Sequence, residues 1–402
     1  MNRDSLKKES LKWLNEGIIT EEQQKQILNR YPAKKRTSLL LTFASLFIGL
    51  GFLTLIASNW SLIPQLGKMS VILVFMLAFY LTGDWVYRNK SARVGLSFIT
   101  IGLFIFGAGI FLTGQMYNYM YFQAIPFLIW AIAAIALFIL YQHPSLFVIA
   151  MTITTVGQLY SAWVYGSFYI VLFVIFVLAF GHYTYHQARG LYGYLFSVSF
   201  VIHVLVLTFS TGQGYYWLLI YFLVLYVIGD VVGKQDIRLP FKSVSVISVF
   251  LLSIIEVFLL SNSYFYENID KSVSFMFIWL SIFVITIVLK IVKKQSWQLI
   301  DLVLFLPVFY VTFGDMFSML CLFAFSLGLL LLGYKEEDHA RVTNGTITFL
   351  ISTLIAYVHL AWAFLDKSLF FFVGGALLFV LSYFLEKKRR TVKNEVQGGD
   401  GK

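Results

Sequence analysis

The sequence predicts an all-α protein, a polytopic transmembrane helical bundle of about 14 spans with a short N-terminal cytoplasmic helical hairpin. The 402 residues are 59% hydrophobic and 12% charged, whereas about a quarter of the residues of a soluble domain are charged. Apolar runs of roughly 20 residues, the length of a membrane-crossing helix, recur from residue 38 to residue 385. Residues 170–180 (IVLFVIFVLAF) are apolar at every position, which excludes the alternation typical of a membrane barrel.

Residues 1–37 are expected to form a cytoplasmic helical hairpin followed by a basic linker. Gly17 suits the left-handed cap that ends a first helix. Thr20 and Gln23 have the spacing of a capping box at the start of a second helix, which Pro32 stops. A hairpin this small cannot bury a core of its own. We therefore expect residues 1–31 to pack on the membrane face of the protein or on a cytoplasmic protein partner.

Residues 38–385 are expected to form the transmembrane helical domain, and residues 386–402 a disordered basic cytoplasmic tail. The expected spans start near Ser38, Met69, Val94, Phe122, Ser145, Ser167, Leu191, Tyr215, Lys242, Ser272, Trp297, Met316, Thr343 and Lys367.

The distribution of Lys and Arg predicts the orientation of these spans. With the N-terminus inside, 27 of the 30 cations lie in the head, the inner loops or the tail, and only Lys68, Lys271 and Lys367 lie outside. Cytoplasmic loops carry such an excess of cations. Both termini are therefore expected in the cytoplasm, beside the anionic inner leaflet of the bilayer. An error of one helix would spoil this partition, but a compensating error of two would not.

Several classes of protein are excluded by composition and motifs. The cations sit in short clusters beside apolar runs and form no continuous basic face, so no nucleic acid is expected as a partner. Cys321 is the only cysteine, which excludes an intramolecular disulfide and a thiolate metal cluster. His182 and His186 share a helix face but lack a third ligand nearby. The chain has no phosphate loop, dinucleotide fingerprint or nucleophile elbow, so neither a cofactor nor a metal is expected.

Ionisable residues within the apolar spans are the first candidate functional group. Glu256, Asp301, His203 and His359 lie inside four different expected spans. A charge at mid-membrane is costly, so such groups often line a polar cavity, relay protons or bind a substrate cation. The alternative is that the carboxyl groups reach interfacial water and the histidines bond between helices.

A second candidate group is an amide-rich and aromatic rim on the outer face. It includes Asn59, Trp60, Gln115 and Tyr117, which could receive a sugar or a lipid headgroup. An ordinary aromatic belt at the membrane interface explains most of these aromatic residues. Asn59 and Gln115 adjoin apolar spans, where an amide tends to be satisfied by another helix or by a ligand.

Two short echoes are consistent with a duplicated hairpin unit. Gly-Gln-x-Tyr occurs at residues 114–117, 157–160 and 212–215. Gly-Asp followed by a cation four residues after the acid occurs at Gly83-Asp84 with Arg88 and at Gly229-Asp230 with Lys234. Short matches also arise by chance in a chain this rich in Gly, Tyr and Phe.

Three stretches of the chain resemble a bacterial family of predicted membrane proteins, domain of unknown function 2157. Residues 11–31 (LKWLNEGIITEEQQKQILNRY) are similar to its N-terminal hairpin, and residues 57–60 (ASNW) and 114–117 (GQMY) to its first spans. Residues 341–390 are similar to a region shared with related membrane proteins. The resemblance implies a bacterial inner-membrane location and supplies no catalytic or binding residues.

The leading functional hypothesis is a transporter or a lipid-linked flippase-like carrier, by analogy with carriers that surround sparse buried charges with many spans. The alternative is a membrane scaffold or sensor that acts through its N-terminal hairpin. A membrane-embedded transferase ranks last because the outer loops are short and offer few acidic groups. We therefore do not expect an enzyme.

Overall fold

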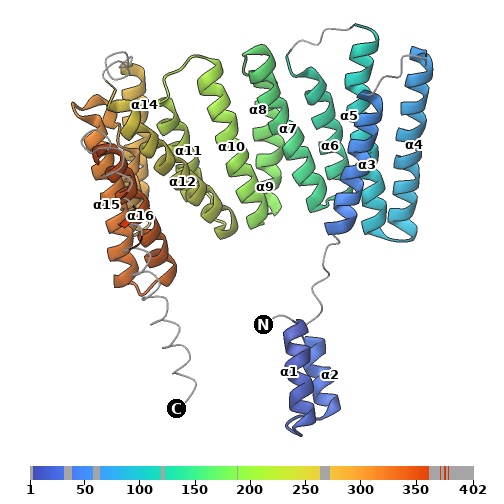
Figure 1. Cartoon of the computed structure of the whole chain (residues 1–402), viewed down its shortest axis with the longest axis horizontal. Coiled ribbons are helices and arrows are strands. Elements are labelled where there is room, and N and C mark those ends of the chain that lie inside the picture. Colours follow the sequence, from blue (N-terminus) through green and yellow to red (C-terminus); the bar gives the residue numbers. More distant parts are fainter. Residues whose placement is uncertain are drawn as a thin grey trace. The chain divides into compact units, whose positions relative to one another are not determined.

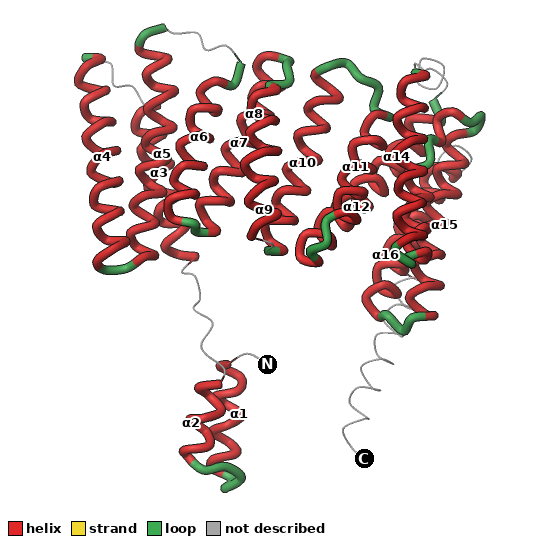
Figure 2. The backbone as a smooth tube through the Cα atoms, turned by 180° about the vertical axis from the view of Figure 1, so that it is seen from behind, coloured by secondary structure: helices red, strands yellow, loops and turns green. Residues whose placement is uncertain are grey.

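The computed structural model describes residues 3–30, 39–57, 64–118, 123–187, 189–262 and 272–361, and the separate residues 372, 375, 376 and 379. These residues form helices and no strands (Figures 1 and 2), which confirms the all-helical prediction. Nine of the described helices are long and apolar enough to cross a membrane. The count of fourteen spans stays a prediction, since most of the expected last span and the whole tail from residue 386 lie outside the described residues.

Two short helices begin the chain, α1 (Arg3–Asn15) and α2 (Glu21–Arg30). Gly17 adopts a left-handed conformation with φ of +70° in the turn between them. The Thr20 amide donates to Gln23 Oε1 at 2.9 Å, and the Gln23 amide donates to Thr20 Oγ1 at 3.3 Å. These reciprocal bonds satisfy amide groups at the start of α2 that have no partner within the helix.

The chain divides into two compact units, Met1–Tyr121 and Phe122–Lys402. The first also contains α3 (Leu39–Ala57), α4 (Gln65–Asn89) and α5 (Ala92–Met116), and α5 packs against both of the others. A Cβ atom at Gly95 would overlap the backbone of Tyr87. The absence of a side chain at this glycine therefore permits the close approach of α4 and α5 just beyond their connecting turn.

The second unit consists of α-helices of varied length, one π-helical turn and two 3₁₀ segments. Its elements are α6 (Ile125–Tyr141), α7 (Pro144–Tyr165), α8 (Ile170–Ile175), the π-helix η1 (Phe176–Phe180), α9 (Gly181–Gln187), α10 (Gly190–Ser210), α11 (Trp217–Val231), α12 (Gln235–Leu260), α14 (Val273–Val292), η2 (Ser296–Phe305), η3 (Val308–Tyr310), α15 (Gly314–Lys335) and α16 (His339–Ala361). Residues 170–187 form one continuous apolar helix that contains the π-helical turn.

One end of the second unit carries all of its described Lys and Arg residues, and we call it the basic end. Contacts between the connecting segments show that they meet there. Lys234 Nζ donates to the Tyr185 carbonyl at 2.6 Å, Arg238 Nη2 donates to Gln295 Oε1, and the Arg341 guanidinium lies 3.8 Å from the Trp297 ring centroid. The cations at this end are Arg189, Lys234, Arg238, Lys242, Lys290, Lys293, Lys294, Lys335 and Arg341.

The eleventh expected span, which starts near Trp297, does not form an α-helix. Residues 296–305 form the 3₁₀ helix η2, and Pro307 separates it from the short η3. A proline cannot donate a backbone hydrogen bond, and its ring crowds the carbonyl four residues earlier. The segment still runs the length of the unit, since it starts among the cations of the basic end and Tyr310 Oη donates to the Ser272 carbonyl at the opposite end, at 3.1 Å.

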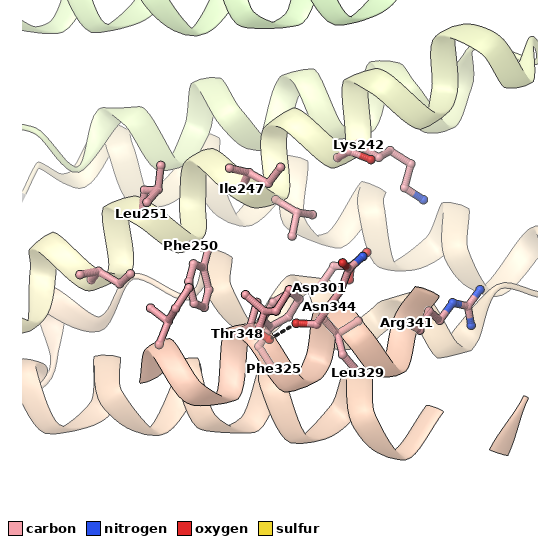
Figure 3. A pocket seen from close by; sticks show the side chains of 15 residues that line it. Lys242, Ile247, Phe250, Leu251, Asp301, Phe325, Leu329, Arg341, Asn344 and Thr348 are labelled. Carbon is pink, nitrogen blue, oxygen red and sulfur yellow. Dashed lines mark hydrogen bonds between the residues drawn. The ribbon is translucent and has the colours of Figure 1, made fainter. Parts of the chain in front are cut away.

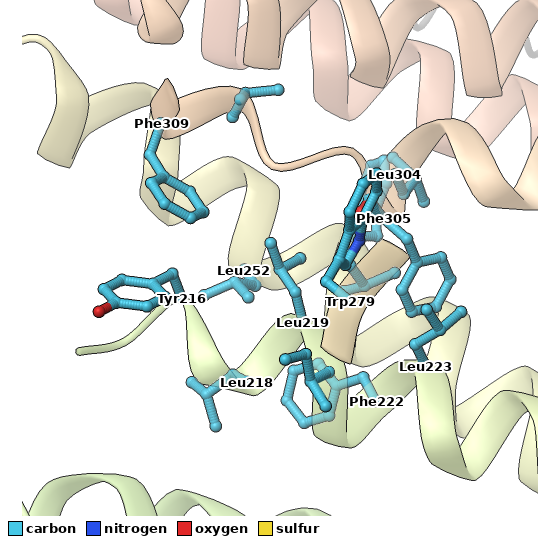
Figure 4. Packing of buried hydrophobic residues seen from close by; sticks show 14 of the residues in the cluster. Tyr216, Leu218, Leu219, Phe222, Leu223, Leu252, Trp279, Leu304, Phe305 and Phe309 are labelled. Carbon is cyan, nitrogen blue, oxygen red and sulfur yellow. The ribbon is translucent and has the colours of Figure 1, made fainter. Parts of the chain in front are cut away.

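Protein surrounds this 3₁₀ crossing. Leu304, Phe305 and Phe309 are nearly inaccessible and pack with residues of α11, α12 and α14 (Figure 4). Trp279 Nε1 donates to the Phe305 carbonyl at 2.9 Å. Irregular backbone is tolerated at membrane depth only where protein covers it or where it lines a cavity, so this packing explains how η2 can replace an α-helical span.

Candidate functional site

A buried charge cluster lies at the basic end, where α11, α12, α14 and η2 meet. We define it as Asp230, Lys242, Lys290 and Gln298. Lys242 Nζ lies 2.8 Å from Asp230 Oδ1, and Lys290 Nζ lies 2.5 Å from Asp230 Oδ2. Both ammonium groups also donate to Gln298 Oε1. The Asp230 and Lys290 side chains are each 1% exposed, so four elements are joined by a polar network whose central ion pair is buried.

A second carboxylate balances the charge of the two lysines. Tyr226 Oη donates to Asp301 Oδ2 at 2.7 Å. The Lys242 and Lys290 ammonium groups lie 4.8 and 4.4 Å from the centroid of the same Tyr226 ring. Tyr226 thus connects Asp301 with the cluster through its hydroxyl and through cation–π contacts. A buried charge that loses its partner is strongly destabilising, so the two acids and two lysines depend on one another.

Two further cations close the cluster toward the connecting segments. Lys293 Nζ donates to the backbone carbonyl of Asp230, which belongs to the last turn of α11. Cations at this position satisfy free carbonyls and complement the helix dipole. Arg238 Nε lies 3.9 Å from Asp230 Oδ1 at the edge of the cluster. The described groups around Asp230 therefore carry more positive than negative charge.

A cavity of about 490 Å³ adjoins the cluster between α12, η2, α15 and α16. We call it the groove. Lys242, Asp301, Asn344 and Arg341 line one part of it, and Figure 3 shows them apart from apolar residues such as Leu251. The rest of the lining is almost entirely apolar. Its apolar residues are Val246, Ile247, Phe250, Leu251, Ile254, Phe325, Leu329, Ile347 and Ile351, and Ser243 and Thr348 complete the lining.

The groove opens on a surface of apolar side chains. Ile247 is 58% exposed, Leu251 54% and Ile347 50%. α15 and α16 form the opposite wall of the groove. The two helices pack closely, since a Cβ at Gly345 would lie 2.8 Å from the Leu330 amide nitrogen. A site with charged groups at one end and an apolar trough that opens sideways has the chemistry to hold an amphiphile.

Arg341 is held in place at the polar end of the groove. Its Nε lies 3.1 Å from Asp338 Oδ2, its Nη1 pairs with Glu336, and its guanidinium covers the Trp297 ring. Asn344 lies one turn further along α16 and lines the groove with it. The guanidinium is thereby positioned before any ligand is present.

The four intramembrane residues singled out by the sequence occupy separate places. Only Asp301 lies at the cluster and the groove. His359 Nε2 lies 3.1 Å from Asp315 Oδ2, and this pair joins α16 to α15. Glu256 is 1% exposed near the far end of α12. No hydrogen bond or ion pair joins any two of the four among the described residues.

His203 lies beside the π-helical turn. Its Nδ1 is 2.8 Å from the Ser199 carbonyl, and its ring stacks on Phe176 with centroids 4.4 Å apart. The Nε2 atom is buried with no hydrogen-bond partner among the described residues. π-helical turns are frequent at functional sites, but the other neighbours of His203 here are the aromatic rings of Phe173 and Phe176.

The expected outer rim is described only in part. Asn59 and Trp60 lie outside the described residues. Gln115 is exposed in the last turn of α5, and Tyr117 is 53% exposed just after it. Both residues belong to the first unit, whereas the cluster and the groove belong to the second, so the rim stays a prediction.

The three Gly-Gln-x-Tyr motifs do not share a structural role. Gln115 is exposed, whereas Gln158 is fully buried, with its side-chain amide beside the backbone N–H and C=O of Tyr169. Gln213 Oε1 accepts from Tyr221 Oη at 2.8 Å. The three motifs thus occupy three environments.

Sequence reasoning missed most of the site. The sequence singles out Asp230 only as part of the repeated Gly-Asp motif, and it assigns Lys242 and Lys290 to the group of loop cations. One signal was present, since Lys290 precedes Ile291 and Val292, so that it lies a turn inside the apolar run. Gln298 and Arg341 gave no signal, because their role depends on which elements pack together. When Lys242 and Lys290 are not counted as loop residues, the excess of Lys and Arg still lies at the basic end.

Comparison with known proteins bears on the N-terminal third of the chain. Residues 11–147 match the family described as predicted membrane protein, DUF2157. The match covers the end of α1, α2 to α6 and the start of α7, and confirms the resemblance over those residues. No curated protein and no solved structure matches the chain. The cluster and the groove lie outside the matched segment. Among the described residues, no group of three or more His, Cys, Asp or Glu residues could hold a metal ion.

Proposed function

We propose that this membrane protein binds a phosphate-bearing lipid or lipid-linked compound in the groove and carries it between leaflets. The observation that supports this proposal is the division of one cavity into a charged end and an apolar trough. A soluble substrate would not need the trough, and a lipid tail alone would not need Arg341. The proposed carrier function follows the analogy with flippases and depends on lipid binding in the groove.

The polar end suits a phosphate headgroup. Arg341 and Lys242 line it, and a guanidinium is the donor best matched to phosphate oxygens. Asp301 lines the same end, so a headgroup that carries an amine beside its phosphate would find partners for both charges. We therefore expect zwitterionic and anionic phospholipids to bind, with the amine-bearing head preferred.

The trough suits an acyl or isoprenoid chain. Along α12 the groove extends from Lys242 to Ile254, a rise of about 18 Å in an α-helix. The exposed apolar lining residues support a mouth that faces the hydrocarbon of the bilayer. A lipid can thus enter sideways from the bilayer without crossing water.

The location and orientation that fit this function are a bacterial inner membrane with both termini in the cytoplasm. The basic end then faces the cytoplasm, as expected from the excess of cations in inner loops. The polar end of the groove would open toward the inner leaflet, and α1 and α2 would lie on the same side as a cytoplasmic hairpin.

Lipid binding can be tested by blocking the trough. Leu251→Trp fills the groove, whereas Leu280→Trp places the same ring on α14, where Leu280 is 48% exposed and does not line the groove. We expect purified wild-type protein and Leu280→Trp to retain phospholipid that native mass spectrometry detects, and Leu251→Trp to retain at least tenfold less. Equal retention by both variants would overturn the proposed site.

Carrier activity requires a separate measurement. Wild-type protein in vesicles should expose a fluorescent phospholipid of the inner leaflet to an external quencher, and Leu251→Trp should not. If lipid binds but never moves, the carrier function is wrong and the protein is a lipid-responsive scaffold or sensor. Deletion of residues 1–33 would then abolish its cellular effect.

A further inference from the structure

Glu256 is a buried acid far from the basic end. It lies in the second-last turn of α12, its side chain is 1% exposed, and its Oε1 has no hydrogen-bond partner among the described residues. All described Lys and Arg residues of this unit lie at the basic end. No cation from the described residues is therefore available to neutralise a Glu256 carboxylate.

The described elements that pack on α12 bring no charged partner to Glu256. Just before α11, the Tyr215 hydroxyl is also buried without a hydrogen-bond partner among the described residues, and it interacts electrostatically with Glu256. Cys321 of α15 is the other titratable neighbour. One turn before Cys321, Ser318 Oγ donates to the Ser253 carbonyl at 2.9 Å, so this hydroxyl is already engaged.

Four further titratable groups of the neighbouring elements have partners elsewhere. Asp315 of α15 and His359 of α16 face each other at 3.1 Å. His203 of α10 bonds to the Ser199 carbonyl, and Asp301 of η2 accepts from Tyr226. On these elements and just before α11, Glu256 Oε1 and the Tyr215 hydroxyl are buried without a hydrogen-bond partner among the described residues, as is His203 Nε2 beside its aromatic neighbours.

An ionised carboxylate in such surroundings is strongly disfavoured, because a buried charge without a partner keeps the full cost of desolvation. A carboxyl group can avoid this cost by holding a proton. Ionisation then requires that water or a cation reach the group, which requires the packing of α11, α12 and α15 to loosen.

We propose that Glu256 is a proton-binding site, occupied when α11, α12 and α15 are packed together and released to water when they separate. The step breaks the O–H bond of the carboxylic acid, transfers the proton to water and leaves a carboxylate near the Tyr215 hydroxyl. Intramembrane acids of this kind serve proton relays and coupled carriers. The proposal does not depend on lipid binding, since Glu256 is not among the residues that line the groove, which ends at Ile254 on α12.

Infrared spectroscopy of the purified full chain tests the protonation directly. The carbonyl stretch of a protonated carboxylic acid should be present at pH 7 in the wild type and lost in Glu256→Gln. The matched control is Asp315→Asn, which removes an acid already paired with a histidine and should leave that band in place. A wild-type minus Glu256→Gln difference with only carboxylate bands would overturn the proposal.

Two further variants keep the test independent of folding and of the groove. Tyr215→Phe removes the neighbouring hydroxyl and should shift the frequency of the band without abolishing it. Leu251→Trp should leave the band unchanged whether or not it blocks lipid binding. If Glu256→Gln fails to fold, an unchanged frequency of the carbonyl band in Tyr215→Phe would count against a protonated Glu256 near the Tyr215 hydroxyl.

Thermal unfolding gives a second readout. Raising the pH from 5 to 8 should lower the Tm of the wild type by several degrees, because the unfolded chain releases the Glu256 proton above a pH of about 4.3, whereas the packed state must keep it. Glu256→Gln should show a smaller decrease over the same range. An equal decrease in both proteins would show that Glu256 does not bind the proton concerned.

Discussion

Asp84 and Asp230 each follow a glycine near the end of an apolar helix, yet their surroundings differ completely. Asp84 is 35% exposed and pairs with Arg88 one turn later, at 2.9 Å. Asp230 is 1% exposed, and its partners Lys242 and Lys290 come from two other helices. The local sequence places a carboxylate at each helix end, but only the packing of neighbouring helices decides whether it is buried.

Replacing each acid by its amide should separate these two environments. Asp230→Asn leaves Lys242 and Lys290 buried without their shared carboxylate, and breaking a buried pair in this way costs about 3–5 kcal/mol. Asp84→Asn removes one exposed pair within a helix, worth about 0.3–0.5 kcal/mol. Thermal unfolding of both variants in detergent measures the difference. Similar Tm values would show that the buried charge cluster contributes little to stability.

His143 provides a pH-dependent contact outside the membrane spans. Its Nδ1 accepts from the Ser145 amide at 3.2 Å and caps α7. Burial, and secondarily the positive charge of Arg189, lower the pKa of His143 in the folded protein. Stability from this group is therefore fully present above its unfolded pKa, about 6.5, and is lost as the pH falls toward the folded pKa.

We expect the wild type to lose more stability than His143→Asn between pH 7.5 and pH 5.5. Asparagine also accepts a hydrogen bond at a helix N-terminus, and it does not titrate in this range. His143→Ala should be less stable than His143→Asn at both pH values, by about 1 kcal/mol, because the cap is lost. Melting curves at the two pH values measure both effects, and parallel curves for the wild type and His143→Asn would contradict the proposed titration.

Among the elements, η2 depends most on its neighbours. A 3₁₀ helix leaves weaker backbone hydrogen bonds than an α-helix, and Trp279 of α14 supplies a bond to the Phe305 carbonyl where η2 ends. Phe309 and Leu304 bury the same region. The element is therefore stabilised by side chains from the helices around it.

Trp279→Phe should test this dependence. It keeps an aromatic ring but leaves the Phe305 carbonyl without its donor, which costs about 1–3 kcal/mol for a buried polar group. Trp163→Phe makes the same change at a side chain that is 91% exposed, and should be nearly neutral. Unfolding by denaturant compares the two, and equal midpoints would mean that the carbonyl finds another donor.

The sequence predicted α-helices reliably because apolar runs of about 20 residues have few alternatives in a bilayer. Expected starts near Val94, Ser145 and Leu191 lie within two residues of α5, α7 and α10. The start near Trp297 was correct in position but wrong in conformation. Pro307 was a visible signal, yet only the surrounding helices show that a 3₁₀ crossing can be buried. The charge cluster was unpredictable for the same reason, since it joins four elements that are distant in sequence.

At the scale of the whole molecule, the second unit has a strong separation of charge between its two ends. Its described cations gather where α12 begins and α14 ends, whereas Thr211 and Gly166 lie in turns at the opposite end. The positive-inside rule assigns the basic end to the cytoplasm. We therefore predict that the basic end faces the cytoplasm in the living cell.

Cysteine labelling can test the orientation because Cys321 is the only native cysteine. In a Cys321→Ser background, we expect Thr211→Cys to react with a membrane-impermeant maleimide added to whole cells. Glu337→Cys, in the exposed turn between α15 and α16, should react only in inverted vesicles. Labelling of both from the same side would contradict an antiparallel arrangement, and exchanged labelling would reverse the orientation.

The 3₁₀ crossing also has a consequence for biogenesis. Ten residues of η2 rise roughly 20 Å, against about 15 Å for the same number in an α-helix. The segment thus reaches far with few residues, but its backbone cannot be left in contact with acyl chains. It should therefore leave the insertion machinery late, after α12 and α14 are in place and while α15 is being made. A nascent chain truncated before α15 should be held at the translocon and then degraded, so the order of synthesis becomes part of how this fold is reached.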